Sequence, residues 1–139
     1  MSNNVKNFWL IRGVSGAGKS TVADLLRMYL PDGVNTEADK FRYIDGVYAY
    51  RDVPNHYAHG NCKREVRQWL EEGMSNIVVS NTSCRRKDVN MYKNMAEKYG
   101  YRFISIVVEN YHESGNTHGV TDEVLEQMEG QLRESIKLR

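Results

Sequence analysis

The chain has 139 residues, of which 40% are hydrophobic and 27% charged, and its formal net charge is +1. This length and composition predict one globular domain over residues 1–139 of a cytoplasmic protein. The balanced charge argues against a protein that coats nucleic acid through bulk positive charge. Two cysteines are too few for a disulfide scaffold. No apolar run reaches the roughly 20 residues that span a bilayer, so no membrane partner is expected.

Short apolar runs alternate with stretches of helical periodicity along the chain. In chain order the predicted elements are a strand at 8–11, a helix at 22–29, a strand at 34–37, a hairpin-like excursion or ordered loop at 43–52, a helix at 55–72, a strand at 77–79, a helix at 85–99, a strand at 103–108 and a closing helix capped by Thr121. This alternation predicts an α/β fold in which helices sandwich a parallel sheet of four or five strands. The ligand is expected at the carboxyl edge of that sheet.

Residues 13–20, Gly-Val-Ser-Gly-Ala-Gly-Lys-Ser, match the Walker A pattern GxxxxGK[ST] in full. A buried strand precedes the motif and a helix follows it, so backbone N–H groups would curl around an anion at the positive end of the helix dipole. Lys19 would reach the β- and γ-phosphates, and the Ser20 hydroxyl would ligate Mg²⁺. The motif therefore predicts a P-loop NTPase that binds ATP and Mg²⁺. The residues expected to hold the nucleotide are Gly13, Ser15, Gly16, Ala17, Gly18, Lys19, Ser20 and Thr21.

A P-loop alone does not separate kinases from switches and motors. A chain of 139 residues has no room for the guanine-reading motifs or oligomer-forming lids of larger NTPases, and it contains no NKxD motif. A small kinase fits best. Asp39 follows the second predicted strand, where a carboxylate would accept a proton from an attacking hydroxyl, and Arg42 would grip an acceptor phosphate. On spacing alone, a capping role for Asp39 and a surface role for Arg42 are equally favoured.

Four segments together resemble the polynucleotide-kinase-like P-loop proteins. They are GVSGAGKST at 13–21, EADKFR at 37–42, IVVSNTS at 77–83 and NTHGVTDEVLEQM at 116–128. That family includes the kinase modules of phage 5′-end-healing enzymes and similar small AAA-type ATP-binding proteins. The resemblance covers almost the whole chain. It implies transfer of the ATP γ-phosphate to a 5′-hydroxyl of DNA or RNA, with a nucleic-acid 5′ end as the expected partner.

The resemblance also implies roles for individual residues. It places Asp39 at the family's general base and Arg42 at its reader of the phosphate next to the acceptor nucleoside. It places Asn81, Thr82 and Ser83 at a turn that lines the same cleft. The polar segment 110–120 is expected to close over the nucleotide as a lid. Arg85, Arg86 and Lys87 open the next helix, where they would either attract a polyanion or form a solvated surface.

The sequence departs from the family pattern where lid arginines are usual, because Gly115 and Gln131 stand there. Such arginines neutralise transition-state charge and are worth about 10³-fold or more, so their absence predicts slow turnover. His118 is a partial substitute or a structural hydrogen-bonding residue. The strand at 77–79 ends in Ser80 rather than in the aspartate of a Walker B site. Mg²⁺ would then rest on Ser20, phosphate oxygens and water, with Asp39 in its outer shell.

Two alternative functions stay open at this stage. The chain could phosphorylate a small molecule such as a nucleoside, a nucleotide or an antibiotic-like alcohol. It could also be an ATP-binding regulatory or inhibitor protein in which catalysis is weakened. Four aromatic residues near the expected acceptor side would stack an acceptor base or pack in the core. They are Phe41, Tyr43, Tyr48 and Tyr50.

Overall fold

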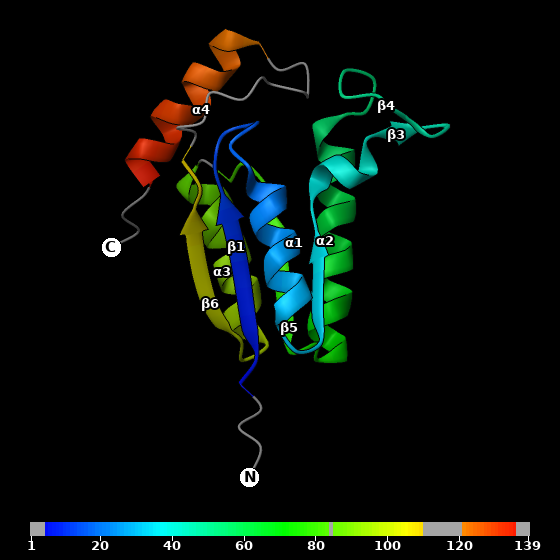
Figure 1. The fold of residues 1–139 in the computed structure, drawn as a ribbon, viewed down its shortest axis with the longest axis vertical. Helices are drawn as coiled ribbons and strands as arrows, with labels where there is room; N and C mark the ends of the chain where they lie inside the picture. Colours follow the sequence, from blue (N-terminus) through cyan, green and yellow to red (C-terminus); the bar gives the residue numbers. More distant parts are fainter. Residues whose placement is uncertain (1–4, 84, 110–120, 136–139) are drawn as a thin grey trace.

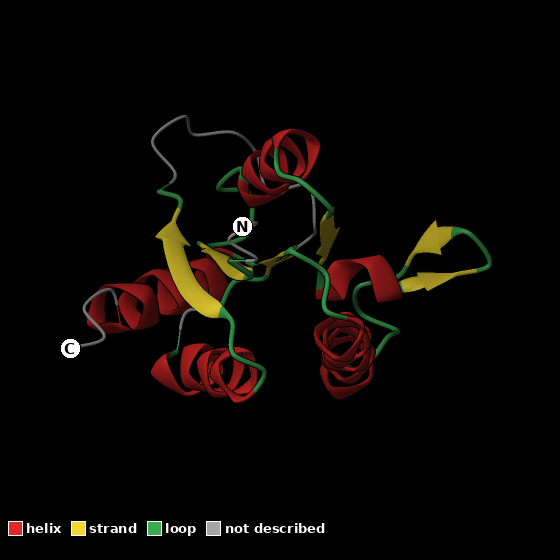
Figure 2. Cartoon of the chain, turned by 90° about the horizontal axis from the view of Figure 1, so that it is seen from below, coloured by secondary structure: helices red, strands yellow, loops and turns green. Residues whose placement is uncertain are grey.

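A computed structural model describes residues 5–83, 85–109 and 121–135. Its centre is a parallel sheet of four strands in the order β2-β5-β1-β6, with helices on both faces (Figures 1 and 2). The sheet strands are β1 (Asn7–Arg12), β2 (Gly33–Thr36), β5 (Asn76–Ser80) and β6 (Arg102–Val107), and β3 (Tyr43–Ile44) pairs with β4 (Val47–Tyr48) in a separate hairpin. The helices are α1 (Lys19–Tyr29), α2 (Asn55–Glu72), α3 (Arg86–Lys98), α4 (Asp122–Ser135) and the short 3₁₀-helix η1 (Ala38–Phe41).

The predicted α/β fold is therefore confirmed, and the predicted helices and strands lie within three residues of their expected bounds. The excursion at 43–52 contains the β3–β4 hairpin, which turns at Asp45 and Gly46. The Thr121 hydroxyl accepts a hydrogen bond from Val124 N at 3.3 Å, as expected of a helix cap. The predicted lid at 110–120, with Gly115 and His118, lies outside the described residues.

Alternation of side chains along the central strands builds two apolar layers. Phe8 and Leu10 of β1 are fully buried in the layer beneath α2 and α3. Ile11 of the same strand and Val78 of β5 are fully buried against Ala23 of α1, on the opposite face. Each such burial of a large apolar side chain stabilises the fold by about 1.5–3 kcal/mol. These layers fix the carboxyl ends of the strands relative to one another.

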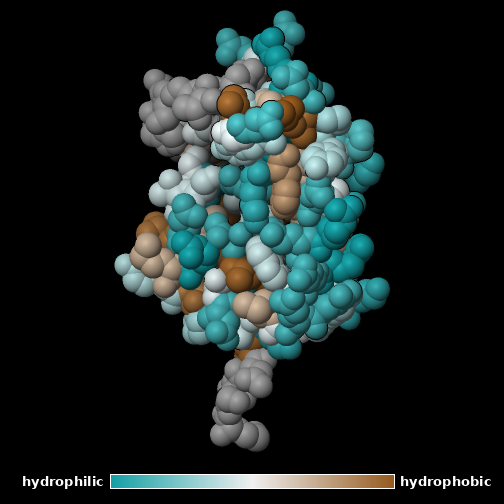
Figure 3. Space-filling view, turned by 90° about the vertical axis from the view of Figure 1, so that its right-hand side faces the viewer, coloured by the Kyte–Doolittle hydropathy of each residue, from teal (hydrophilic) through white to brown (hydrophobic). Residues whose placement is uncertain are grey.

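Exposed apolar side chains of the described residues gather at two places, and two more lie elsewhere, Val5 before β1 and Tyr57 on α2. On α1, Leu25 is 49% and Tyr29 is 79% exposed. The pattern identified the helix correctly, but only the small Ala23 on it is buried, and Val22 and Leu26 are partly buried. The second place is the β3–β4 hairpin, where Ile44 and Val47 are exposed; Figure 3 shows hydrophobic patches at this end of an otherwise largely hydrophilic face.

The buried Arg12 fastens α4 to the end of the sheet. Its guanidinium donates to the Ser83 carbonyl oxygen at 3.1 Å and to the Ser135 hydroxyl at 2.7 Å. Donation to the Ser135 carbonyl at 3.3 Å also places positive charge at the negative end of the α4 dipole. The effect is to hold α4 across the carboxyl edge (Figure 1). No helix in the described part of the chain is both long and apolar enough to cross a membrane.

Candidate functional site

The loop between β1 and α1 has the strained, glycine-dependent shape that its sequence predicts. Gly16 and Gly18 have φ angles of 83° and 99°, in the left-handed region that other residues avoid. Gly13 N donates to the Thr82 carbonyl oxygen at 3.2 Å, which ties the loop to the end of β5. A Cβ on Gly13 would lie 2.5 Å from the Val108 carbonyl oxygen, so a side chain there would displace the backbone that follows β6.

This loop forms one wall of a large cavity of about 940 Å³ at the carboxyl edge of the sheet. The loop and helix residues that line it are Ser15, Gly16, Gly18, Lys19, Ser20 and Thr21. Two other residues expected at the nucleotide, Gly13 and Ala17, are not in this lining and contribute through the shape of the loop; Ala17 N donates to the Val14 carbonyl oxygen at 3.1 Å. Lys19 Nζ donates to that same oxygen at 2.8 Å.

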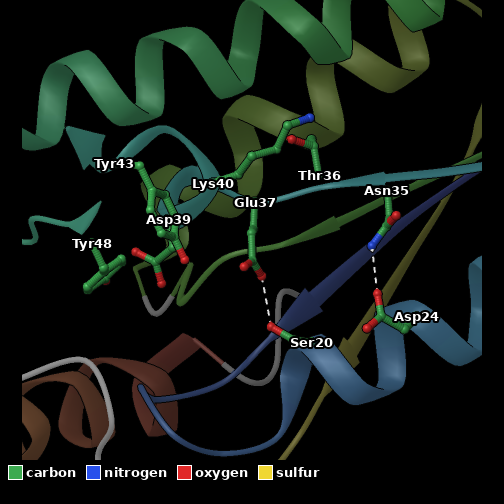
Figure 4. Close-up of a pocket in the computed structure, with 9 residues that line it drawn as sticks. All are labelled: Ser20, Asp24, Asn35, Thr36, Glu37, Asp39, Lys40, Tyr43 and Tyr48. Atoms are coloured by element: carbon green, nitrogen blue, oxygen red, sulfur yellow. Dashed lines mark hydrogen bonds between the residues drawn. The ribbon is translucent and has the colours of Figure 1, made fainter. Parts of the chain in front are cut away.

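Glu37 stands next to Ser20 at the end of β2, a contact that the sequence did not single out. The Ser20 hydroxyl donates to Glu37 Oε2 at 2.8 Å (Figure 4). The Ser80 hydroxyl, at the end of β5, donates to the same oxygen at 3.1 Å. The carboxylate thus joins the phosphate loop to two neighbouring strand ends. Two features of the sequence could have pointed to Glu37. It is an acidic residue at the end of the second predicted strand, and the strand at 77–79 is followed by Ser80 and not by an acid.

Asp39 and Arg42 form an ion pair around η1. Arg42 Nε donates to Asp39 Oδ1 at 2.8 Å, and Arg42 is only 3% exposed. Its guanidinium lies 5.1 Å from the centroid of the Tyr50 ring, and Nη1 donates to the Val53 carbonyl oxygen at 3.4 Å. Arg42 therefore holds the carboxylate of Asp39 in place. Both residues line the large cavity together with Ser20. A phosphate contact by Arg42 stays a prediction.

The hairpin brings a second donor to Asp39. The Tyr48 hydroxyl hydrogen-bonds to the Asp39 carboxylate, and burial together with this carboxylate raises the pKa of the Tyr48 hydroxyl. Tyr48 therefore stays protonated and serves as the donor. The Tyr43 ring packs edge-on against Tyr48, with 5.4 Å between centroids. Ala49 N donates to the Arg42 carbonyl oxygen at 2.7 Å and fastens the hairpin to η1.

Asn81 lines the large cavity, but its side chain bonds inward rather than to an open face. Its Oδ1 accepts from Ala38 N at 2.8 Å, and its Nδ2 donates to the Tyr92 hydroxyl at 3.2 Å. Both groups are buried. Asn81 therefore has a structural role, because its amide fixes the residue that precedes Asp39, and its contact with a substrate stays a prediction. Thr82 also lines the cavity, and its carbonyl oxygen is the anchor of Gly13 described above.

Positive side chains line the large cavity on the side of α2 and α3. Arg85 and Lys87 contribute from the start of α3, and Lys63 contributes from α2. Arg85 also pairs with Asp88 at 3.2 Å. Arg86 does not line the cavity; it donates to the Glu134 carbonyl oxygen on α4 at 3.5 Å, so its predicted substrate contact lacks geometric support.

A face of α4 completes the large cavity. Val124, Gln127, Met128 and Gln131 line it, whereas the exposed Arg133 does not. Gln131 thus occupies the cavity at the position where the family resemblance leads one to expect an arginine. His59 of α2 lines the opposite wall. Burial, followed by the nearby positive charge of Arg42, lowers the pKa of His59, which favours the neutral imidazole at pH 7.

A smaller cavity of about 650 Å³ opens on the other side of the same carboxylates. It shares Ser20, Glu37 and Asp39 with the large cavity. Its other lining residues are Asp24, Asn35, Thr36, Lys40, Tyr43 and Tyr48 (Figure 4). Asn35 Nδ2 donates to Asp24 at 3.1 Å, and Lys40 is paired with Glu65 at 2.8 Å. Ser20, Glu37 and Asp39 therefore stand between two cavities.

The donor set at this wall fits Mg²⁺. Mg²⁺ prefers hard oxygen ligands and keeps several waters, with one or two carboxylates and substrate phosphates completing its shell. Ser20 offers a hydroxyl oxygen, and Glu37 offers a carboxylate next to it. Over residues 5–83, 85–109 and 121–135, no three His, Cys, Asp or Glu side chains converge into a cage that could hold a metal ion. The geometry suits a metal ion brought with a nucleotide.

Comparisons with known proteins bear on the fold of the chain. No protein-family model matches the chain. Human NEDD4-binding protein 2 is 26% identical over 126 residues, which is 86% of this chain and 7% of that protein. An Autographa californica nuclear polyhedrosis virus protein, named for bifunctional polynucleotide kinase/RNA ligase activity, is 27% identical over 119 residues. That match covers 75% of this chain and 16% of the viral protein. The chain therefore spans less than a fifth of each of these two relatives.

Solved structures show the same fold. A chain of the Pnkp1/Rnl/Hen1 RNA repair complex matches with a TM-score of 0.74 at 13% identity, over 99% of this chain and 47% of that chain. The Mycobacterium tuberculosis APS kinase CysC matches with a TM-score of 0.52 at 14% identity, over 93% and 98% of the two chains. The expected resemblance is confirmed at this level: the chain has a polynucleotide-kinase-like P-loop fold.

Proposed function

We propose that this chain is an ATP-dependent phosphotransferase that transfers the γ-phosphate to a hydroxyl acceptor, with a polynucleotide 5′-hydroxyl as the favoured acceptor. One observation carries the proposal. The carboxylate of Asp39, held by Arg42 at 2.8 Å, lines the same cavity as Lys19 and Ser20 of the phosphate loop. Phosphoryl transfer requires mainly alignment, charge neutralisation and a group that accepts the acceptor's proton, and this arrangement supplies all three.

In the proposed reaction, the loop amides and Lys19 hold the β- and γ-phosphates of ATP. Asp39 accepts the proton of the acceptor hydroxyl while the acceptor oxygen forms a bond to the γ-phosphorus. The bond between the γ-phosphorus and the β–γ bridging oxygen breaks, and ADP leaves. Ser20 would help to hold Mg²⁺, which would neutralise charge on the β- and γ-phosphates when it is bound. Arg42 and Tyr48 keep the Asp39 carboxylate in its position.

A polynucleotide acceptor is favoured by the charge of the large cavity. Besides Lys19, the lining contains Arg42, Lys63, Arg85 and Lys87. An acceptor strand carries one negative charge per nucleotide, so these side chains would bind its phosphates and release counterions. The name of the viral relative is consistent with this choice. The smaller cavity is lined by Tyr43 and Tyr48, whereas Tyr50 lines the large cavity beside Arg42.

The direct test is incubation with γ-labelled ATP and a panel of acceptors. The panel contains 5′-hydroxyl DNA and RNA oligonucleotides, nucleosides and nucleotides, with Lys19→Ala as the inactive control. We expect label at the 5′ end of oligonucleotides, and a KM for them that rises with salt, with a log–log slope of about 0.7 per phosphate contact. Label on small acceptors alone, with a salt-independent KM, would overturn the polynucleotide assignment and leave the phosphotransferase intact.

A second candidate is a nucleotide-binding module with little or no turnover. The observation that favours it is Gln131, which lines the large cavity where a lid arginine is expected. This candidate predicts that ATP binds while no acceptor in the panel becomes labelled. It also predicts that Asp39→Asn changes no biological activity of the protein. The first candidate predicts label transfer that Asp39→Asn removes.

A further inference from the structure

The carboxylate of Glu37 is in direct contact with the phosphate loop through the Ser20 hydroxyl. In P-loop proteins an aspartate at the end of a neighbouring strand helps to hold Mg²⁺ beside the loop's hydroxyl residue. Here the strand next to β1 is β5, and it ends in Ser80, which has no charge. The next strand, β2, is followed by Glu37. Its carboxylate accepts hydrogen bonds from both Ser20 and Ser80.

We propose that Glu37 supplies, from the end of β2, the metal-holding carboxylate that the end of β5 lacks, and that it acts on Mg²⁺ bound with the nucleotide. The inference rests on the proposed nucleotide binding and goes beyond it, since it assigns the metal's carboxylate to Glu37 rather than to Asp39. Ser80 keeps the strand-end position but acts as a hydrogen-bond donor that orients Glu37. Glu37 and Ser80 together thus fill the role that a single strand-end aspartate has in other P-loop proteins.

The hydrogen-bond pattern explains how Glu37 would act. A serine hydroxyl has one proton and two lone pairs, so when Ser20 donates its proton to Glu37 its lone pairs can face a cation. A carboxylate that accepts a ligand's proton fixes the orientation of the ligand and increases its basicity. Both hydrogen bonds that the described residues make to Glu37 end on Oε2. This leaves Oε1 for a metal-bound water.

The other acids of the smaller cavity are less suited to this role. Asp39 already accepts hydrogen bonds from Arg42 at 2.8 Å and from the Tyr48 hydroxyl, and in the proposed reaction its remaining acceptor capacity serves the acceptor hydroxyl. Asp24, on α1, accepts from Asn35 at 3.1 Å, and it lines the smaller cavity but not the large one. Glu37 is the acid that touches the loop serine and lines both cavities.

The test measures binding, not turnover. The affinity of Mn²⁺ for the complex of the protein with a non-hydrolysable ATP analogue is followed by electron paramagnetic resonance. The affinity of the analogue alone is measured in EDTA by calorimetry. We expect Glu37→Gln, which keeps the shape of the side chain, to weaken Mn²⁺ binding by about 10- to 100-fold. In EDTA the same variant should bind the analogue as tightly as the wild type or more tightly, because a negative charge beside the phosphates is gone.

A misfolded variant would bind the analogue more weakly in EDTA as well as losing Mn²⁺ affinity. Weaker Mn²⁺ binding together with unchanged or tighter analogue binding therefore cannot come from misfolding. Asp24→Asn is the matched control, because it removes an acid from the same smaller cavity, and it should change Mn²⁺ affinity by less than about twofold. If Glu37→Gln binds Mn²⁺ like the wild type, or if Asp39→Asn alone loses it, the inference is wrong while the proposed function stands. If the wild type binds no analogue with or without metal, both fail.

Discussion

The two cavities that meet at Ser20, Glu37 and Asp39 differ in charge. The large one collects the phosphate loop and positive side chains, among them Lys63 and Lys87. The smaller one adds Asp24 to the shared carboxylates, and its single Lys40 is already paired with Glu65. This difference in charge indicates that the two cavities bind different kinds of ligand. Polyanions are favoured on one side of the wall, whereas the other side suits cations and water.

The division follows from the topology of the sheet. The loop after β1 and the basic residues Arg85 and Lys87 at the start of α3 line the large cavity. β2 lies at the edge of the sheet and passes directly into η1, so Glu37 and Asp39 are two residues apart on one short segment. A carboxylate wall between the cavities is thus a consequence of the order β2-β5-β1-β6.

The largest effect is expected for Asp39, which lies between the two cavities. Asp39→Asn removes the proton acceptor but keeps the shape of the side chain, so kcat for label transfer should fall by about 10²- to 10⁴-fold. The affinity for the ATP analogue should be unchanged, because the phosphate loop is intact. Steady-state kinetics and calorimetry on the same preparation check both parts. An equal loss of analogue binding would show that Asp39 serves structure or nucleotide binding instead.

The next effect is expected on the polyanion side. Gln131→Arg places a positive charge in the large cavity where charge develops during transfer, and it should raise kcat, by up to about 10³-fold. Arg133→Gln is the matched control, because Arg133 is exposed outside the cavity, and it should leave kcat unchanged. A Gln131→Arg variant with the wild-type rate would remove the explanation given for slow turnover.

A smaller effect is expected from the hairpin. Tyr48→Phe deletes the hydroxyl that bonds to Asp39 and keeps the ring, so kcat should fall by about three- to tenfold with KM for ATP unchanged. Tyr43→Phe, on the same hairpin, should keep the wild-type kcat. Melting temperatures of both variants, measured alongside, should match the wild type. A loss shared equally by Tyr43→Phe and Tyr48→Phe would point to disturbed packing of the hairpin.

The charge difference between the cavities can be tested by a pair of lysine substitutions. Lys87→Gln, in the large cavity, should raise KM for an oligonucleotide and reduce its log–log salt slope by about 0.7. Lys40→Gln, in the smaller cavity, should change neither quantity. Titrations of KM from low to high salt measure both. Equal salt slopes of KM for Lys87→Gln and Lys40→Gln would contradict the proposal that the oligonucleotide binds in the large cavity.

The smallest effect concerns pH and stability. Burial and the charge of Arg42 lower the pKa of His59 from its usual 6.5. Near and just below pH 6.5 the unfolded chain binds this proton and the folded chain does not, so the unfolding free energy falls as pH falls through this window. It levels off below the folded-state pKa. His59→Gln should flatten this part of the curve in urea titrations, and an unchanged slope would contradict the lowered pKa of His59.

Local sequence patterns predicted the elements well because their causes are local. The helix at 55–72 has the expected bounds, and a glycine follows it with a φ of 76°. The phosphate loop was predicted because its chemistry is contained in eight consecutive residues. Asp39 and Arg42 were singled out for a similar reason, because they follow the second predicted strand within one short segment of sequence.

Contacts between distant segments were not predictable in this way. Glu37 meets Ser80 across 43 residues, and Arg12 meets Ser135 across 123 residues. The family resemblance placed Asn81 in the substrate cleft, but its hydrogen bond to Ala38, 43 residues away in the sequence, was not predictable. The exposure of Leu25 likewise depends on which face of α1 the sheet covers. Each of these outcomes requires the packed fold.

The measurement that tests the central claim most directly is a crystal structure with ADP, Mg²⁺ and a short 5′-hydroxyl oligonucleotide. The account predicts the diphosphate on the loop at residues 13–20 and the acceptor's 5′ oxygen within about 3.2 Å of the Asp39 carboxylate, on the side of the large cavity. A 5′ oxygen bound away from Asp39, or a diphosphate bound away from the loop, would contradict it.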